Sequence, residues 1–408
     1  MSTVSMETTV RGESRPVAAE ASVQPKAASR LLFVDNIRVM LTVLVLLFHL
    51  MITYAGTGDW YYTEGREDLV TGVLGAWFLG VNQAFFMGLF LLISAYFVPG
   101  SYDRKGVGRF LKDRLIRLGI PLALYGWIIR PLLVYLDPIK VPGPRQPLWR
   151  FLTQQYFRDE PILGSGPLWF IETLLIFSAV YALWRLFTRS STNPCPAAPA
   201  QARSFPGNFT IALLALFMGL ATFVVRLWLP MGWSFEPLNL QFPYFVQYIT
   251  LFVVGLIAYR RNWLLSLGNK QGRLWLGMAV LLILIFWPLM VGGGAIDQGV
   301  EAFAGGWHWQ ACAFALWESF LCLSMCIGLV YLFRRYGDRQ GRLAGFLSRN
   351  AYAAYLIHEV LITIVAYAAR GVEVYPLLKW ALVSLVALPL CFGLSDLIRR
   401  LPYADRVL

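Results

Sequence analysis

Charged residues are scarce in this chain, and their scarcity argues against an ordinary water-soluble protein. Of 408 residues, 14% are charged and 58% are hydrophobic, whereas a soluble domain normally carries about 25% charged residues. The mean hydropathy of +0.58 agrees with this composition. A surface with so few charges must mostly face something other than water, so the composition predicts an integral membrane protein.

Cysteine and histidine are also sparse, and their spacing fits neither a metal site nor a disulfide framework. The five cysteines include no Cys-x-x-Cys pair, and the chain has three histidines. Four of the cysteines lie in apolar stretches, where cysteine behaves as a small hydrophobic residue. We therefore predict neither a bound metal nor a set of disulfides.

What the chain does have is apolar blocks of membrane-spanning length. A helix needs about 20 apolar residues to cross a hydrocarbon core about 30 Å thick. Ten blocks meet this requirement: 32–54, 74–98, 116–136, 166–188, 209–229, 241–259, 274–291, 309–332, 351–369 and 377–398. Tryptophans such as Trp60 lie near the predicted ends, where indole rings anchor at the interface. The sequence predicts an all-α, polytopic bundle of about ten transmembrane helices surrounded by membrane lipids.

The polar stretches predict the organisation of the chain. Residues 1–30 contain no apolar stretch after a short basic start, so we interpret them as a disordered cytoplasmic tail rather than a cleavable signal peptide. A membrane domain is expected over 31–400, followed by a short cytoplasmic tail at 401–408. Within the domain, the Pro-, Ala- and Ser-rich stretch 189–208 is typical of a flexible linker.

The distribution of lysine and arginine predicts the orientation in the membrane. With the N-terminus inside, the inner loops and tails hold 25 of these residues and the outer loops hold 6. Basic residues favour the cytoplasmic side, so we expect both termini in the cytoplasm. The same distribution accounts for the net charge of +12 without a nucleic-acid partner.

Ionisable residues inside the spans mark the candidate site, because such residues usually face a bundle interior or a wet cavity. The first span, FVDNIRVMLTVLVLLFHLMITY, contains Asp35, Arg38 and His49. On a helix, Arg38 and His49 face within about 20° of one another and lie about 16 Å apart along the axis. We expect them to line one water-accessible passage. Two structural alternatives remain: Arg38 paired with Asp35 at the membrane boundary, and His49 as a hydrogen-bonded packing residue.

A basic element, FLKDRLIRLGIP, leads into the third span. Its Arg114 and Arg117 are three residues apart and would lie side by side on a helix. They could anchor the helix at lipid phosphates, or they could clamp a phosphate-bearing donor arriving from the cytoplasm.

The remaining deep charges fall at two predicted levels. The outer half is expected to hold, with His49, four residues: Arg130, Glu172, Arg226 and Glu318. The inner half is expected to hold five: Asp35, Arg38, Arg114, Arg117 and His358. Each could be part of a structural ion pair. Together, the two levels match the needs of a donor site below and an acceptor site above.

At this point the residues resemble bacterial acyltransferase family three, membrane enzymes that acylate envelope glycans and related acceptors. The resemblance rests on five segments in order: FVDNIRVMLTVLVLLFH, FFMGLFLLISAYFVP, FLKDRLIRLGIP, GPLWFIETLLIF and SRNAYAAYLIH. It implies that Arg38 and His49 are the family's signature pair and that Arg114 and Arg117 are its basic motif beside the donor. Two positions depart from the family pattern: Ala95, where Gly is usual, and Glu359, where Pro is common after the histidine.

The resemblance implies an acyltransferase of the bacterial inner membrane. It would move an acetyl or similar short acyl group from cytoplasmic acyl-CoA to a hydroxyl of an extracytoplasmic glycan or related acceptor, with no permanently bound cofactor. His49 would act as base or transient acyl carrier, Arg38 would hold the donor, and Glu172 would orient His49 or the acceptor. Asp35 and His358 are expected beside the donor. The alternative is a proton-coupled transporter of a small polar solute, with the buried charges forming its pathway.

Overall fold

The computed structural model describes residues 30–56, 58, 60–64, 68–136, 146–159, 164–188, 204–236 and 238–408. Leu32–Leu408 forms one compact unit, and all that follows concerns it. The predicted tail at 1–30 lies outside the described residues except for its last residue. The predicted linker at 189–208 lies outside them up to residue 203.

Ten helical segments of the described chain are long and apolar enough to cross a membrane, and each overlaps one predicted block. This confirms the predicted all-α bundle. Their bounds are Leu32–Ala55, Leu69–Tyr96, Val98–Tyr135, Gly166–Phe187, Asn208–Arg226, Phe242–Arg261, Asn269–Gly292, Trp309–Tyr336, Arg342–Gly371 and Pro376–Arg399. Within the described residues, β-structure is limited to one isolated bridge between Phe235 and Leu240.

The longer α-helices are α1 (Leu32–Ala55), α2 (Leu69–Gln83), α3 (Phe86–Tyr96), α4 (Val98–Arg114), α5 (Ile120–Leu124), α6 (Arg130–Leu136), α9 (Trp169–Phe187), α10 (Asn208–Arg226), α11 (Phe245–Arg261), α13 (Asn269–Gly292), α16 (Trp309–Tyr336), α17 (Arg342–Ala368) and α18 (Pro376–Arg399). Short helices are α7 (Leu148–Arg150), α8 (Phe157–Asp159), α12 (Trp263–Ser266), α14 (Ala295–Gln298), α15 (Glu301–Ala304) and α19 (Ala404–Val407). Three π-helical turns, η1 (Leu115–Gly119), η2 (Tyr125–Ile129) and η3 (Phe151–Tyr156), and three 3₁₀ turns, η4 (Gly166–Leu168), η5 (Phe242–Tyr244) and η6 (Ala369–Gly371), complete the order.

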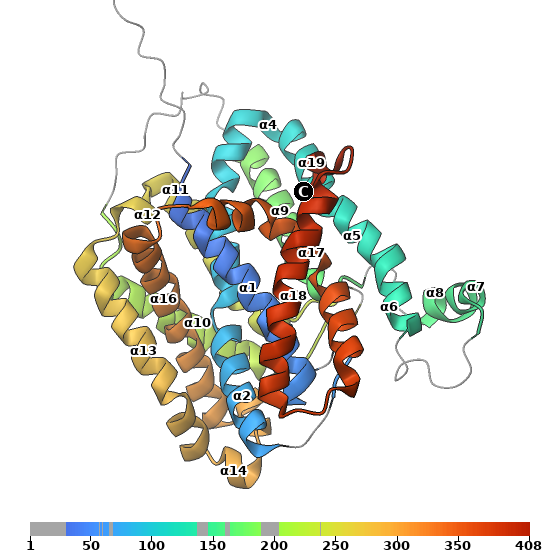
Figure 1. Ribbon diagram of the computed structural model, residues 1–408. Coiled ribbons are helices and arrows are strands. Elements are labelled where there is room, and N and C mark those ends of the chain that lie inside the picture. The colour runs from blue at the N-terminus through green and yellow to red at the C-terminus, as the bar shows by residue number, and fades with distance from the viewer. Residues whose placement is uncertain are drawn as a thin grey trace, which may run out of the picture. The chain divides into compact units, whose positions relative to one another are not determined.

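Helix α1 lies in the interior of this unit. It contacts α2, α16, α17 and α18, and Figure 1 shows it in blue, crossing between α16 and the α17–α18 pair. Its apolar side chains Ile37, Leu41 and Leu50 are fully buried. A polar group on α1 therefore meets protein on several sides, which makes the polar stripe of the first span a feature of the bundle interior.

The third span is longer than predicted and is not a uniform helix. The charged stretch before residue 116, which was expected to be a loop, forms α4, with one non-helical residue at Gly106 (φ 71°). Two ion pairs involve this polar stretch: Lys105 pairs with Asp113 at 2.5 Å, and Asp103 pairs with Arg260 at 2.6 Å. The rod then continues through η1, α5, η2 and α6. Such π-helical turns are rare and are frequent at functional sites.

The second span is bent between α2 and α3, at Ala84 and Phe85. The bend exposes the backbone inside the bundle, where an unpaired carbonyl costs free energy. Gln247 of α11 supplies a partner, since its Nε2 donates to the Ala84 carbonyl at 2.9 Å. The bend thereby fixes how α2, which carries Gln83, meets the rest of the bundle.

Candidate active site

Two histidines from distant parts of the chain meet in the interior. His358 of α17 lies with Nε2 3.2 Å from Nδ1 of His49 on α1, and the His358 side chain is completely buried. The predicted depth of His358, level with the donor residues, is therefore wrong. The physical reason is the length of α17: it begins at Arg342, nine residues before the predicted start, so His358 sits farther along its helix than the hydropathy pattern indicated.

Backbone carbonyls determine the tautomers of the pair. His49 Nδ1 lies 2.9 Å from the Val45 carbonyl, and His358 Nδ1 lies 2.5 Å from the Tyr355 carbonyl. A carbonyl oxygen only accepts hydrogen bonds, so in the neutral rings each Nδ1 carries the proton. The Nε2 of His358 is then an acceptor, and it receives a share of the His49 Nδ1–H. The Nε2 of His49 then carries a lone pair and has no hydrogen-bond partner among the described residues.

Trp60 covers the His49 ring. The two rings are stacked with centroids 4.3 Å apart and planes 24° apart, and Trp60 is buried. The expectation that Trp60 anchors a helix at the interface is therefore wrong, because the loop after α1 folds back onto the bundle. An indole face beside an imidazole stabilises a positive charge on that ring by a cation–π interaction.

An ion pair holds this loop in place. Lys379 of α18, 3% exposed, donates to both carboxylate oxygens of Glu64 at 2.6 Å. The Glu64 amide donates to the Thr53 carbonyl of α1 at 2.9 Å, and Tyr62 Oη donates to Glu64 at 2.9 Å. Burial, and then the Glu64 carboxylate, raise the pKa of Tyr62, so its hydroxyl remains a donor. The segment that carries Trp60 is thereby tied to two helices.

A tyrosine–glutamate network lies next to the histidine pair. Tyr125, on the π-helical turn η2, donates from Oη to Glu359 Oε1 at 2.5 Å and lies 3.0 Å from the Tyr61 hydroxyl. Burial, followed by the Glu359 carboxylate, raises the pKa of Tyr61 well above its usual value. Glu359 is one of the two departures from the family pattern, and the structure gives it a role: it links η2 to the helix of His358.

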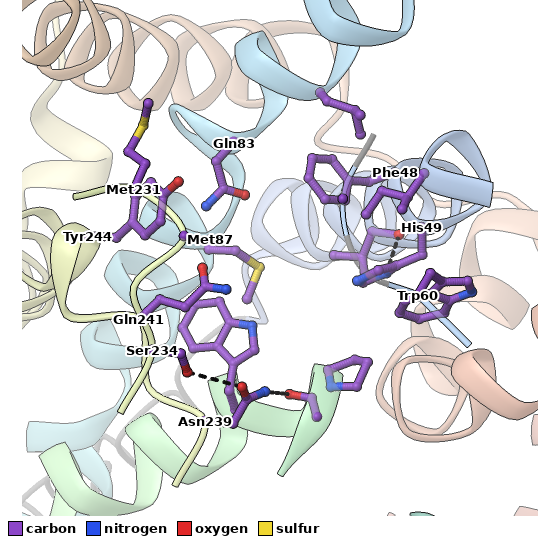
Figure 2. Close-up of a pocket in the computed structure, with 18 of the residues that line it drawn as sticks. Phe48, His49, Trp60, Gln83, Met87, Met231, Ser234, Asn239, Gln241 and Tyr244 are labelled. Atoms are coloured by element: carbon purple, nitrogen blue, oxygen red, sulfur yellow. Dashed lines mark hydrogen bonds between the residues drawn. The ribbon is translucent and has the colours of Figure 1, made fainter. Parts of the chain in front are cut away.

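His49 lines a cavity of about 760 Å³. Figure 2 shows His49, Phe48 and Trp60 on one side, with Gln83, Gln241 and Tyr244 across from them. Arg130 and Glu318, both predicted at the level of His49, also line the cavity. A space of this size accommodates a small organic substrate, since ligand pockets span about 300–1,000 Å³.

The Glu318 carboxylate is paired with Arg226. The guanidinium of Arg226, on α10, lies 2.8 Å from Glu318 Oε2 on α16, and its carbon is 5.0 Å from the Tyr244 ring centre. Arg226 is 0% exposed. Burying an ion pair of this kind costs desolvation free energy, and removing one partner is strongly destabilising because the other charge stays buried alone. It therefore acts first as a structural link between α10 and α16 beside the cavity.

The basic residues gather near the other end of α1. Arg114 interacts electrostatically with Arg117 and Arg38, and the Tyr352 hydroxyl of α17 donates to the Arg117 carbonyl. Their spacing predicted two neighbours on one helix. In the structure, Arg114 ends α4 and Arg117 belongs to the π-helical turn η1 that follows it. Three cations near one another form a site suited to an anion of more than one charge.

Two sequence predictions concern Arg38. It pairs with Asp35 at 3.5 Å, its side chain is 35% exposed, and its guanidinium carbon lies 4.8 Å from the centre of the Phe97 ring. Among the described residues, the lining of the cavity includes His49 but not Arg38. Arg38 and His49 thus lie on one helix, and the common water-accessible passage expected between them stays a prediction.

Glu172 is not brought to the histidine pair. It is buried near the start of α9, where its carboxylate interacts with Ser165. Its Oε2 has no hydrogen-bond partner among the described residues. The Ser165 hydroxyl also donates to the Leu238 carbonyl at 3.1 Å, so Glu172 lies beside the loop that closes the cavity rather than beside His49.

The comparison with known proteins gives the family. Residues 31–396 match the family model of the acyltransferase domain of family three. The chain is similar to glucans biosynthesis protein C of Salmonella agona (strain SL483) and of Salmonella paratyphi A (strain ATCC 9150 / SARB42). It is 25% identical to each over 244 residues, which make up 57% of this chain and 59% of each relative. The chain thus spans less than two thirds of these relatives, and no solved structure matches it. With ten helices of membrane-spanning length among its described residues and a family match over nearly its whole length, this chain is a multi-pass membrane protein that belongs to acyltransferase family three.

Proposed function

We propose that the chain transfers a short acyl group, acetyl or similar, from acyl-CoA to a hydroxyl of a glycan, with His49 as the general base. One observation carries this proposal: the hydrogen bonds of the histidine pair leave the Nε2 of His49 as a lone pair on a ring that lines a substrate-sized cavity. An imidazole nitrogen that carries a lone pair can accept the proton of a hydroxyl group, which suits His49 to act as a general base.

The reaction needs no further reactant. The acceptor hydroxyl oxygen attacks the thioester carbon while its proton passes to His49 Nε2. A carbon–oxygen bond forms, the carbon–sulfur bond breaks, and the imidazolium returns the proton to the departing thiolate. Direct transfer in one site requires no acyl-histidine. While His49 is protonated, its Nδ1–H still donates to His358 Nε2, and the Trp60 ring lies over the positive charge.

The donor is assigned to the basic end of α1. Arg114, Arg117 and Arg38 would bind the phosphates of acyl-CoA, because guanidinium groups form strong charge-assisted hydrogen bonds to phosphate. This end is proposed to face the cytoplasm, where acyl-CoA is available, and the cavity to face the outside of a bacterial inner membrane. The predicted excess of Lys and Arg in the inner loops supports that orientation.

The two sites must become continuous when the donor binds. Arg38 and His49 lie eleven residues apart on α1, about 16 Å along its axis. Acyl-CoA carries its phosphates and its thioester at opposite ends of a long flexible arm, so one donor molecule could occupy both sites. The glycan acceptor is supported by the relatives, which are named for the biosynthesis of glucans.

The test compares the histidines of the chain. Purified full-length protein in lipid nanodiscs is incubated with acetyl-CoA or succinyl-CoA and a glucose oligosaccharide, and both CoA release and acylated sugar are measured. His49→Ala should lower transfer by about a hundredfold or more, the usual contribution of a general base. His308→Ala, at the start of α16, serves as the matched control and should keep full activity. Full transfer by His49→Ala would refute the assignment.

A further inference from the structure

The wall of the cavity opposite His49 carries side-chain amides that are available to a ligand. Gln83 of α2 and Gln241, just before η5, both line the cavity. Neither amide group makes a hydrogen bond to any residue that the structure describes. Figure 2 shows Gln83, Met87 and Gln241 on one side of the view, across from His49 and Trp60. An amide offers both a donor and an acceptor, which is the pairing that a sugar hydroxyl requires.

Other groups on this side are already engaged and give the wall a fixed shape. Ser234 Oγ donates to Asn239 Oδ1 at 3.2 Å, and Asn239 Nδ2 donates to the Gly166 carbonyl at 3.3 Å. Asn239 itself has a left-handed backbone (φ 52°), a conformation that asparagine tolerates better than most residues. These bonds tie the loop before η5 to the loop before α9. These hydrogen bonds hold the backbone of the wall from which the free amides extend.

Aromatic rings complete the lining in a way that suits a sugar ring. Trp169 and Tyr244 line the cavity, and Trp169 stacks on Tyr248 with ring centres 5.1 Å apart. A supported indole offers a flat apolar face with a polar edge. Amides for hydroxyl groups and a flat apolar face for C–H groups are together the chemistry of a neutral carbohydrate site.

The charges of the lining disfavour a negatively charged ligand group at this wall. Arg130 is the one cation among the described residues that line the cavity, and its Nη1 donates to the Tyr156 hydroxyl at 3.2 Å. The acidic lining residues are Glu318, which pairs with Arg226, and the exposed Glu236. A phosphate or carboxylate placed at this wall would meet the Glu236 carboxylate, whereas Arg130 interacts with Tyr61, which packs on Trp60 on the His49 side, so an uncharged group is favoured here.

We propose that Gln83 and Gln241 form the acceptor subsite and that it takes an uncharged sugar ring, with one of the sugar's hydroxyls directed at His49. The subsite rests on the proposed function, since it places the acceptor of that reaction. It adds what the reaction alone leaves open: which wall holds the acceptor, and that the acceptor is neutral where it contacts that wall.

The experiment measures acceptor and donor dependence separately. In the nanodisc assay with acetyl-CoA and a neutral glucose oligosaccharide, Gln83→Ala and Gln241→Ala should each raise the acceptor KM by about tenfold, the equivalent of one lost hydrogen bond. The donor KM and the slow hydrolysis of acetyl-CoA without acceptor should not change. Gln271→Ala, on α13 with its amide bonded to the Pro206 carbonyl, is the matched control and should leave every constant unchanged.

Two further measurements could refute the proposal. Gln241 is exposed, so its variant should fold even if Gln83→Ala does not, and an unchanged acceptor KM in Gln241→Ala overturns the subsite. As inhibitors, methyl glucoside and glucose 1-phosphate present the same free ring hydroxyls, and the neutral sugar should inhibit more strongly. Stronger inhibition by the phosphate ester overturns the neutral subsite. Absence of transfer by the wild-type protein, in contrast, would count against the proposed function itself.

Discussion

The two ends of α1 differ in how their charged groups are paired. At the cavity end, ionisable side chains form four pairs: His49 with His358, Tyr125 with Glu359, Arg226 with Glu318 and Lys379 with Glu64. At the basic end, Arg114 and Arg117 repel one another and Arg38. Neither Arg114 nor Arg117 forms a side-chain ion pair with a described residue, although Arg114 lies over the Phe110 ring at 5.3 Å.

This contrast distinguishes a site that holds its own geometry from one that lacks an anion. Paired groups keep their positions whether or not a substrate is present, which is what a base needs for proton transfer. Clustered cations are destabilising until a counter-charge arrives, so they gain most from binding a multiply charged ligand. This contrast supports the proposal that the cavity end carries out the chemistry and the basic end binds the donor.

The largest expected effect is on stability, and it differs in sign between the ends. Arg226→Met leaves Glu318 buried without its partner, which should cost about 3–5 kcal/mol. Arg114→Met removes a repelling cation and should leave stability unchanged or slightly increased. Thermal unfolding of both variants in the same nanodiscs measures the difference. A loss of similar size in Arg114→Met would mean that the basic end is a structural ion network and not a binding site.

The next effect concerns capture of the donor. The double variant Arg114→Ala/Arg117→Ala should raise the KM for acyl-CoA by about a hundredfold, since each charge-assisted hydrogen bond to phosphate is worth about 1.5–3 kcal/mol. The affinity should also become less sensitive to salt. Lys112→Ala, an exposed neighbour on α4, is the control. Equal donor affinity in the double variant and in the control would remove the donor from this end.

A smaller effect is expected at His358, which positions His49 and does not touch substrate. His358→Leu removes one of the two acceptors of the His49 Nδ1–H, leaving the Val45 carbonyl, and should lower kcat by about thirtyfold, as for one hydrogen bond to a charged group. His358→Gln retains an acceptor oxygen and should restore part of that loss. The donor KM should stay constant in both. If glutamine and leucine behave alike, the hydrogen bond between the rings has no role in the reaction.

The sequence predicted the bundle because membrane spans are a local property of the chain. About 20 consecutive apolar residues determine each one, and all ten were found from such runs. It could not predict that residues 98–114 continue as α4, whose Asp103 pairs with Arg260, 157 residues away in the chain. Hydropathy measures apolar length and carries no information on such pairs.

The site was predicted in part, for a related reason. His49, Arg38 and Arg114 stand out as charges in or beside apolar runs, and that signal is local. The contact of His49 with His358 spans 309 residues and depends on where α17 begins. Tyr125 and Gln241 carry no charge and resemble ordinary membrane and loop residues, so nothing in the sequence singled them out. For Glu172 the charge was visible, but its distance from His49 was not.

The smallest expected effect tests whether the cavity end also prepares for the charge that forms during the reaction. Trp60→Leu removes the ring stacked on His49 and should lower kcat by about fivefold, close to 1 kcal/mol of cation–π stabilisation. Trp60→Phe keeps an aromatic face and should lose less. Trp149→Leu, an exposed indole on α7, controls for the loss of a tryptophan. Unfolding temperatures distinguish two roles of Trp60, stacking on His49 and supporting the loop by packing. If the role is packing, the substitution should lower the unfolding temperature together with kcat. Equal rates for leucine and phenylalanine variants of normal stability would mean that the indole shields His49 without stabilising its charge.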